Sequence, residues 1–320
     1  MRKIFTLLMI LTLGLLTGCG GNDSANAPRE HFLHIATGNT AGTYYPIGGA
    51  ISEILSTKIE KMHSGVQTTS GSIANLRLLA DGTVEMAIIQ NDIAYYAVNG
   101  TEMFKDDNKY KFDTLRGLMS LYQESCQIVT RAEAGINSVA DLKGRKVSVG
   151  VEGSGVEANA RQILEAYGLS YSDIEPVHLS FASSDKALQE GSIDAAFFTA
   201  GAPTNAISNA AANIQIKILD IDDEHFKQLH EKYPFYTRSV IAAGTYNNQP
   251  EAVQTIGVMA ILACNENINA DLGYKIAKTI CDNLTTFRDA HPVVAKFDKA
   301  HVGDGMTITF NEGAEKFFKE

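Results

Sequence analysis

The chain has 320 residues, with 27 Lys and Arg against 37 Asp and Glu, and its formal net charge is −10. This acidic balance lacks the basic footprint that nucleic-acid binding requires, so we expect no nucleic-acid partner. With 45% hydrophobic residues the chain can fill two lobes of roughly 100–200 residues each, and beyond the N-terminal segment no stretch approaches the length of a membrane-spanning helix.

The N-terminus has the features of a secretory signal. A short basic start precedes an apolar run at 4–16, which is too short to span a bilayer of roughly 30 Å. The run ends in a Leu-Thr-Gly-Cys sequence at Cys19, which resembles the lipobox of bacterial lipoproteins. We therefore predict a signal peptide at 1–18, lipidation of Cys19 and a flexible tether at 19–30. An ordinary cleaved signal with a chance Cys is the alternative. The predicted location is extracytoplasmic, with the protein lipid-anchored to the membrane in the periplasm or on the outer face of the cell.

Beyond the tether, apolar strands alternate with amphipathic helices, which predicts mostly parallel sheets with helices on both faces. The first elements are expected as strands at 33–37, 66–69, 86–90, 115–121 and 127–131, and as helices at 46–59, 73–80 (capped by Ser72) and 93–98 (capped by Asp92). The next are a helical turn at 139–142, strands at 146–149, 178–181, 195–199, 216–221 and 239–244, and helices at 156–167, 184–189, 204–211 and 223–233.

The last part of the chain is expected to return to the first lobe through 252–263 and helices at 270–288 and 314–319. Crossings near 118–130 and 238–250 would then form a hinge. The predicted first lobe is discontinuous, and the proposed boundaries are 31–122 with 246–320 for the first lobe and 123–245 for the second.

A ten-residue pattern occurs twice, about 110 residues apart, at 81–90 and 190–199. Each copy reads acid, Gly, hydroxyl, β-branched residue, acid, any residue, Ala, two large apolar residues and a polar stop. One copy could be a common helix-to-strand turn. Two copies, each about 40 residues after a strand that runs into glycines, indicate two similarly built lobes. A cleft between two lobes is a place for a small ligand.

Small hydroxyl, amide and glycine residues follow the expected strands, where ligands gather in open α/β sheets. The helix N-termini at such loops offer free backbone N–H groups and about half a positive charge each, which suits one carboxylate. Each loop could instead merely cap its helix, but five such loops together favour binding. The candidate ligand-binding residues are Asn39, Gly42, Thr43, Tyr44, Ser72, Gln90, Asp92, Gly153, Ser154, Gly155, Thr199, Gly201 and Pro203.

Sharper chemical motifs are absent from the sequence. The loop at 38–42 lacks the Gly-Lys-[Ser/Thr] of a phosphate loop, and 153–155 lacks the spacing of a nucleophile elbow. No nucleophile–base pair and no zinc spacing is found, so we expect no catalytic residue, metal or cofactor. Of Cys126, Cys264 and Cys281, at most one pair can form a disulfide. A Cys264–Cys281 pair is left open, depending on whether their strand and helix pack together.

Several of these segments together resemble the TAXI family, the solute receptors of TRAP (tripartite ATP-independent periplasmic) transporters. They are Thr-Gly-x-x-x-Gly-Thr-Tyr-Tyr-Pro-x-Gly-Gly at 37–49, the segment 70–79 with Gln-x-Asp at 90–92, and the segments 153–161 and 191–203. The resemblance covers essentially the whole mature chain. It implies a type II periplasmic-binding-protein fold, in which a hinge joins two α/β lobes around a cleft. It also implies delivery of an organic anion or amino acid, often glutamate or glutamine, to a sodium-driven permease.

The sequence departs from the family pattern at two positions. Glu152 stands where the family usually has Pro, and Asn39 where it often has Gly. A Glu152 near the cleft would favour a ligand that also carries an ammonium group, whereas a Glu152 in solvent would have no such effect. The ligand within this class is therefore left open.

The predicted function is that of a lipid-anchored receptor, not an enzyme, which closes on a small carboxylate or amino acid and docks on its permease. Thr43, Ser72 and Ser154 would bind the carboxylate, and Gln90 with Asp92 would recognise the remaining polar group. The alternatives are a sensory receptor for a membrane signalling partner and a secreted lipoprotein enzyme. The missing general base argues against the enzyme.

Overall fold

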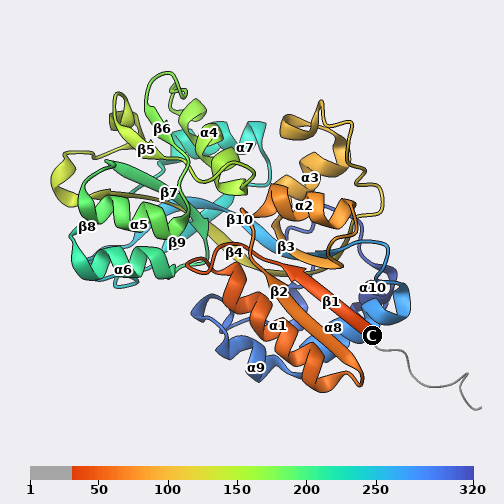
Figure 1. Cartoon of the computed structure of the whole chain (residues 1–320). Helices are drawn as coiled ribbons and strands as arrows, with labels where there is room; N and C mark the ends of the chain where they lie inside the picture. The colour runs from red at the N-terminus through yellow and green to blue at the C-terminus, as the bar shows by residue number, and fades with distance from the viewer. Residues whose placement is uncertain (1–30) are drawn as a thin grey trace, which may run out of the picture.

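The computed structural model describes residues 31–320 as two α/β lobes that share one mixed sheet (Figure 1). The predicted signal peptide (1–18), the tether (19–30) and Cys19 lie outside the described residues. The strands are β1 (His31–Ala36), β2 (Met62–Gln67), β3 (Met86–Gln90), β4 (Arg116–Arg131), β5 (Lys146–Ser148), β6 (Glu175–Val177), β7 (Ala195–Ala200), β8 (Ile216–Leu219), β9 (Thr237–Ile241) and β10 (Val253–Cys264). The α-helices are α1 (Tyr44–Lys58), α2 (Ser72–Ala80), α3 (Asn91–Asn99), α4 (Gly155–Ala166), α5 (Phe181–Glu190), α6 (Asn205–Asn213), α7 (Asp223–Lys232), α8 (Ala270–Asp282), α9 (Leu284–Asp289) and α10 (Glu312–Lys319).

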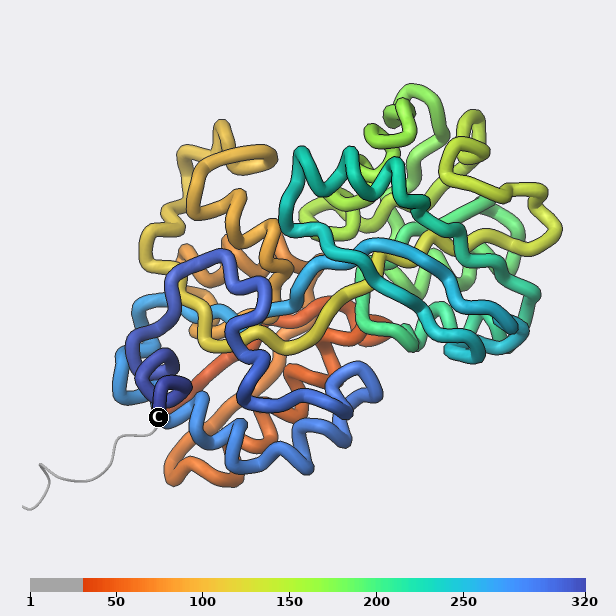
Figure 2. The backbone as a smooth tube through the Cα atoms, turned by 180° about the vertical axis from the view of Figure 1, so that it is seen from behind, coloured from red at the N-terminus to blue at the C-terminus, as the bar shows by residue number. Residues whose placement is uncertain are grey.

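Two long antiparallel strands connect the lobes. The sheet order is β2-β1-β3-β10-β4-β7-β5-β6, with β8 paired to β4 and β9 to β10. Strand β10 pairs with β9 through 253–257 and with β3 through 260–264, and β4 pairs with β7 through 125–130. Figure 2 shows these two strands, yellow and light blue, running between the lobes. Any change in the angle between the lobes must therefore involve β4 and β10.

The first lobe buries α1 against the sheet on one face. Ile47, Ile51 and Ile54 are buried at the spacing of one helix face, and they belong to the same core cluster as Ile276 of α8 and Phe287 of α9. Burial of each large aliphatic side chain contributes about 1.5–3 kcal/mol. This layer holds α1, and so the loop that precedes it, in a fixed position.

A second core cluster runs through both lobes. It includes Leu76 of α2 and Ile93 of α3 in the first lobe, and Val147 of β5 and Phe198 of β7 in the second. All five residues of β3 are buried, as expected for an interior strand covered by helices on both faces. Its predicted bounds, 86–90, are confirmed.

Four of the sequence predictions differ from the structure as follows. The two strands expected at 115–121 and 127–131 are one continuous strand, β4, because the polar residues between them find partners inside the sheet. Gln123 donates to the Thr237 hydroxyl at 2.7 Å, and the hydroxyls of Ser125 and Ser239 lie 2.8 Å apart. A strand was expected at 178–181, but the observed strand β6 ends at Val177, and α5 begins at Phe181.

The other two differences concern the second crossing and Asp92. The segment at 238–250 was expected to cross between lobes, but β9 pairs only with the first part of β10, and β10 itself makes the crossing. Asp92 was expected to cap its helix. It lies in the first turn of α3, after the N-cap residue Gln90, where a carboxylate is favoured by the helix dipole. The lobe boundaries at 122/123 and 245/246 stay a proposal.

Within residues 31–320, Cys126, Cys264 and Cys281 are all free thiols, so the Cys264–Cys281 disulfide left open by the sequence is not formed. In the same range no helix has the length and hydrophobicity needed to cross a bilayer.

Candidate functional site

A cavity lies between the two lobes and encloses about 510 Å³ of space between atoms, part of it open to solvent. Residues from both lobes line it. They are Gly38, Asn39, Gly42, Thr43, Tyr44, Ser70, Gly71, Ser72, Gln90, Glu124, Gly150, Val151, Ser154, Gly155, Val156, Leu179, Ser180, Phe181, Thr199 and Ala200.

Five helices begin at this cavity. The N-cap residues of α1, α2, α3, α4 and α5 are Thr43, Gly71, Gln90, Ser154 and Ser180, and all five line it. Each helix start carries backbone N–H groups without an intrahelical partner and about half a positive charge. The first three helices come from the first lobe and the last two from the second. Together they form an environment suited to an anion.

The serine and threonine side chains of the lining are buried and held in place. Ser72 is 2% exposed, and its oxygen accepts a bond of 3.1 Å from the Gln90 backbone N–H and lies 3.4 Å from the Tyr44 hydroxyl. Thr43, also 2% exposed, donates to the Gly201 carbonyl of the other lobe at 3.3 Å. These hydroxyls are therefore positioned before a ligand arrives.

The lobes touch each other around the cavity. The backbone N–H of Ala74 donates to the Gly153 carbonyl at 3.1 Å, and the Gln90 side-chain amide donates to Asn159 Oδ1 at 3.1 Å. Gly71 and Ser154 also approach closely, because a Cβ on Gly71 would lie 3.5 Å from the Ser154 Cβ. The structure thus shows the lobes in contact, with the cavity enclosed between them.

One acidic side chain in the lining has no partner. Glu124, in the middle of β4, is 1% exposed, and neither carboxyl oxygen makes a hydrogen bond of acceptable geometry among the described residues. Burial is the largest influence on the pKa of this carboxyl, and the nearby side chains of Tyr44, Gln90 and Tyr122 each lower it. Burial outweighs them and raises the pKa of Glu124 to about 8.

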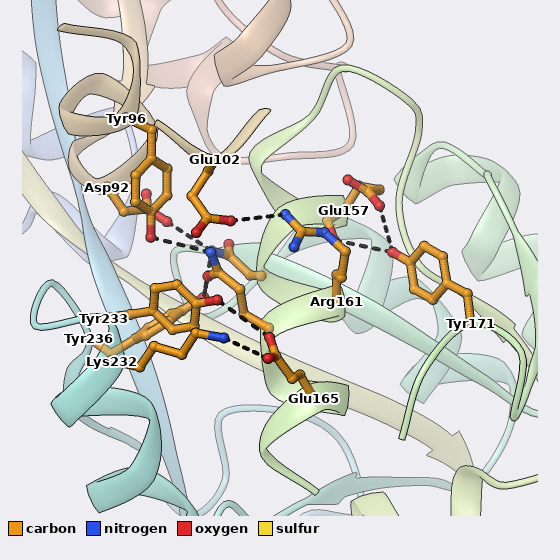
Figure 3. Close-up of polar contacts among 12 residues, drawn as sticks. Asp92, Tyr96, Glu102, Glu157, Arg161, Glu165, Tyr171, Lys232, Tyr233 and Tyr236 are labelled. Carbon is orange, nitrogen blue, oxygen red and sulfur yellow. Dashed lines mark hydrogen bonds and ion pairs between the residues drawn. The ribbon is translucent and has the colours of Figure 1, made fainter. Parts of the chain in front are cut away.

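The side chain of Gln90 is oriented by a relay from Asp92, across the lobe boundary. Asp92 Oδ2 accepts from Asn159 Nδ2 at 3.0 Å, so Asn159 turns its oxygen toward Gln90. Gln90 must then donate its Nε2, and its Oε1 is left buried without a partner. Figure 3 shows Asp92 among the interlobe contacts around Tyr236, whose hydroxyl accepts from the same Asn159 amide at 2.9 Å.

An ion pair reinforces this interlobe contact at its outer edge. Arg161 of α4 lies 3.6 Å from the Glu102 carboxylate of the first lobe (Figure 3). Arg161 is not part of the cavity lining.

Of the thirteen predicted binding residues, nine line the cavity: Asn39, Gly42, Thr43, Tyr44, Ser72, Gln90, Ser154, Gly155 and Thr199. The other four lie outside the lining. Asp92 reaches it only through Asn159, Gly201 supports Thr43, Gly153 contacts Ala74, and Pro203 follows a cis peptide bond beyond Gly201. Glu152, the acid considered from sequence, is exposed beside a separate surface hollow.

Sequence reasoning missed Glu124, Ser180 and Phe181. Glu124 is a polar residue inside an apolar strand, and it was interpreted as a break between two strands. Ser180 lay in a segment expected to be a strand, but it caps α5 by accepting from the Ser183 N–H at 3.2 Å. Its spacing from Ser183 at the start of a helical pattern was a signal that could have identified the cap. The described residues contain no group of three His, Cys, Asp or Glu placed to hold a metal.

Two α/β lobes that share two connecting strands and enclose a polar cavity define the periplasmic-binding-protein fold, and the predicted type II fold of this class is confirmed by solved structures. One is a protein from Bordetella bronchiseptica RB50, at 16% identity over 91% of this chain and 98% of that chain, with a TM-score of 0.55. A putative L-cystine ABC transporter from Listeria monocytogenes matches at 12% identity over 83% and 97%, with a TM-score of 0.52. The alkanesulfonate-binding protein SsuA from Xanthomonas axonopodis pv. citri, bound to MOPS, matches at 13% identity over 92% and 85%, with a TM-score of 0.50.

Identities this low establish the shared fold and nothing about the ligand. A family model gives the narrower assignment: the model of the NMT1-like family matches residues 35–320, and the chain belongs to this family.

Proposed function

We propose that the protein is an extracytoplasmic solute receptor that closes its two lobes on a small carboxylate or amino acid, with glutamate or glutamine favoured. The observation that carries this proposal is the convergence of five helix N-termini on one enclosed cavity. Such a site stabilises a carboxylate through amide dipoles and hydroxyls.

The residues have separate roles in this proposal. Thr43, Ser72 and Ser154 hydrogen-bond the carboxylate, and each caps or begins a helix at the cavity. Gln90 recognises the remaining polar group, and Asp92 sets the orientation of the Gln90 amide through Asn159. Asp92 is therefore a positioning residue in the proposal.

The partner we propose is a membrane permease of the TRAP type. The support is the sequence resemblance to the TAXI family and the predicted lipid anchor, which would keep the receptor beside the membrane. The names of two similar solved structures refer instead to alkanesulfonate binding and to an ABC transporter, so they do not support a TRAP partner. Reconstitution with a TRAP permease in liposomes, with receptor-dependent uptake of a radiolabelled amino acid as the readout, tests the partner separately from the ligand.

Native mass spectrometry of freshly purified protein, followed by thermal-shift screening of amino acids and dicarboxylates, tests the ligand class. A ligand present at about 100 times its Kd adds about 2.7 kcal/mol to stability. For a chain of this size we expect a rise in Tm of about 4 °C.

The Ser72→Ala, Gln90→Ala double variant should lose this shift while it stays folded. The matched control is Ser208→Ala with Gln228→Ala, two residues on helices outside the cavity, which should keep the full shift. A full shift in the first double variant would remove these two residues from the site. The absence of a shift with every amino acid and carboxylate would reject the proposed ligand class.

A further inference from the structure

We propose that Glu124 recognises an ammonium group of the ligand, so that the receptor selects zwitterionic amino acids over carboxylates of the same shape that lack the ammonium. This inference rests on the proposed function and names the ligand class of the same cavity. Its basis is the set of unpartnered polar atoms that the lobes bring together there.

A buried carboxyl without hydrogen bonds is rare in folded proteins and needs an explanation. Glu124 is 1% exposed, lines the cavity, and has two oxygens without a partner among the described residues. It sits on β4, one of the two strands that connect the lobes, opposite Val258 of β10. Tyr44, Gln90 and Tyr122 lie close enough to affect its pKa, but neither oxygen accepts a hydrogen bond of acceptable geometry from them, which leaves the carboxyl open to a ligand group.

The number and kind of the unpartnered atoms fit a primary ammonium. Both oxygens of Glu124 and the Oε1 of Gln90 are buried acceptors without a hydrogen bond of acceptable geometry, and the Tyr122 hydroxyl beside Glu124 is also unpartnered. The relay from Asp92 through Asn159 keeps the Gln90 oxygen, and not its NH₂ group, as the free end. An ammonium group has three N–H donors and no acceptor, so it can satisfy three acceptors of this kind.

No side chain of the lining supplies the opposite charge. Among the described residues that line the cavity, Glu124 is the one acidic residue, and there is no Lys, Arg or His. The helix N-termini are suited to the ligand's carboxylate, while Glu124 is suited to a cation. Burial raises the pKa of Glu124 to about 8; a bound ammonium would favour its charged form, whereas a ligand with only negative groups would give that charge no partner.

None of the titratable groups that face Glu124 supplies a positive charge. Tyr44 of α1 and Tyr122 of β4 are phenols whose pKa is raised well above the ordinary value, and Cys126 is a thiol whose pKa burial raises to about 12. All three are neutral at pH 7. Asp92 of α3 is a second acid and raises the pKa of Glu124 further. A bound ammonium would be the first positive group at this place.

Isothermal titration of two matched ligand pairs tests the inference: L-glutamate against glutarate, and L-glutamine against glutaramate. Each pair differs only in the ammonium group. We expect the wild-type protein to bind at least one amino acid about 100-fold or more tightly than its deaminated partner. Glu124→Gln should bring this ratio to within about tenfold, mainly by weakening the amino acid.

Glu152→Gln is the matched control, because Glu152 is an exposed acid outside the lining, and its ratio should equal that of the wild type. Circular dichroism and Tm establish that Glu124→Gln is folded. If Glu124→Gln does not fold, the affinity ratio of the wild-type protein alone tests the inference.

The outcomes separate the inference from the proposed function. If glutarate or glutaramate binds within tenfold of its amino acid, or if Glu124→Gln leaves the ratio unchanged, the role of Glu124 is wrong while the carboxylate receptor stands. If none of the four compounds binds the wild-type protein, the glutamate- or glutamine-like function fails, and the inference fails with it.

Discussion

Adding one methyl group at position 155, in the variant Gly155→Ala, should weaken ligand binding without lowering the stability of the ligand-free fold. Gly155 is the first residue of α4 in the second lobe, and it faces Gln90 of the first lobe. A Cβ on Gly155 would lie 1.8 Å from Gln90 Oε1 and 2.4 Å from its Cδ, far closer than atoms can approach. Within its own lobe an alanine at the start of a helix is well tolerated, because it restricts the unfolded chain and suits helical backbone.

The expected loss of affinity follows from what Gln90 must give up. To make room, its side chain has to turn away and break the 3.1 Å hydrogen bond to Asn159 Oδ1, or the lobes have to stay apart. Leaving a buried acceptor such as Asn159 Oδ1 without its donor costs about 1–3 kcal/mol. Ligand binding in the closed form should therefore weaken about 5- to 150-fold.

Isothermal titration with L-glutamate and the Tm of the ligand-free protein give the two measurements. We expect Gly155→Ala to lose affinity while its ligand-free Tm stays within about 2 °C of the wild type, since the change acts between lobes. Gly49→Ala is the control, because Gly49 lies in α1 and a Cβ there would meet no atom within 4 Å. Unchanged affinity in Gly155→Ala would refute the idea that the lobes approach this closely around a ligand, and a large fall in its ligand-free Tm would show an effect on folding instead.

The remaining predictions concern titration, thiols and the core. Because burial raises the pKa of Glu124 to about 8 and an ammonium binds its charged form, affinity for L-glutamate should rise about tenfold from pH 6 to pH 7 and level off above pH 8; a flat profile would contradict this. Glu124 should favour the ligand-free fold most below its unfolded pKa of 4.5, and this contribution of up to about 5 kcal/mol should be lost as the pH rises to 8; denaturant titrations should find the corresponding part of the pH dependence absent in Glu124→Gln. Cys126 and Cys264 are buried with pKa values raised to about 12, so Ellman's reagent should leave both unreacted in the native protein at pH 8 and modify both after unfolding without reductant; failure to react when unfolded would indicate a disulfide. Phe287→Ala, at a fully buried side chain, should cost about 3–5 kcal/mol of unfolding free energy, and a cost below 1 kcal/mol would show that α9 does not belong to the core.

The parts of the fold that depend on local pattern were predictable from sequence. The bounds of β3 follow from a run of apolar residues between a turn and a polar stop, and the end of α2 at Ala80 follows from its helical spacing. Ser72, predicted to cap this helix, is instead its first residue, after the N-cap residue Gly71. The site loops were predictable for a similar reason, because small polar residues at the ends of strands mark helix starts, and Thr43 and Ser154 are such residues. Nine of the twenty lining residues were therefore predictable from local features.

What the sequence could not supply depends on contacts between distant segments. Glu124 looked like part of a polar break, because the sequence does not show that β4 continues through it and places it under Tyr44 and Gln90. Glu152 was considered as the acid of the site because it lies next to a predicted loop, but the chain turns it to solvent. An acidic side chain near the site was considered from sequence, but tertiary packing places Glu124 in the cavity lining and leaves Glu152 exposed.

The division of donors between the lobes gives a physical reason for closure. The first lobe presents the starts of α1, α2 and α3 to the cavity, and the second lobe presents those of α4 and α5. A carboxylate held by one lobe alone would contact only part of this set of donors. The ligand would therefore favour the closed arrangement by the difference between its binding free energies in the closed and open arrangements. Since no Lys or Arg lines the cavity within residues 31–320, this difference would come, in the proposed receptor, from neutral dipoles and from Glu124, and separating the lobes would remove a large share of it at once. A receptor built in this way can hold its ligand when closed and release it when a membrane partner opens the lobes.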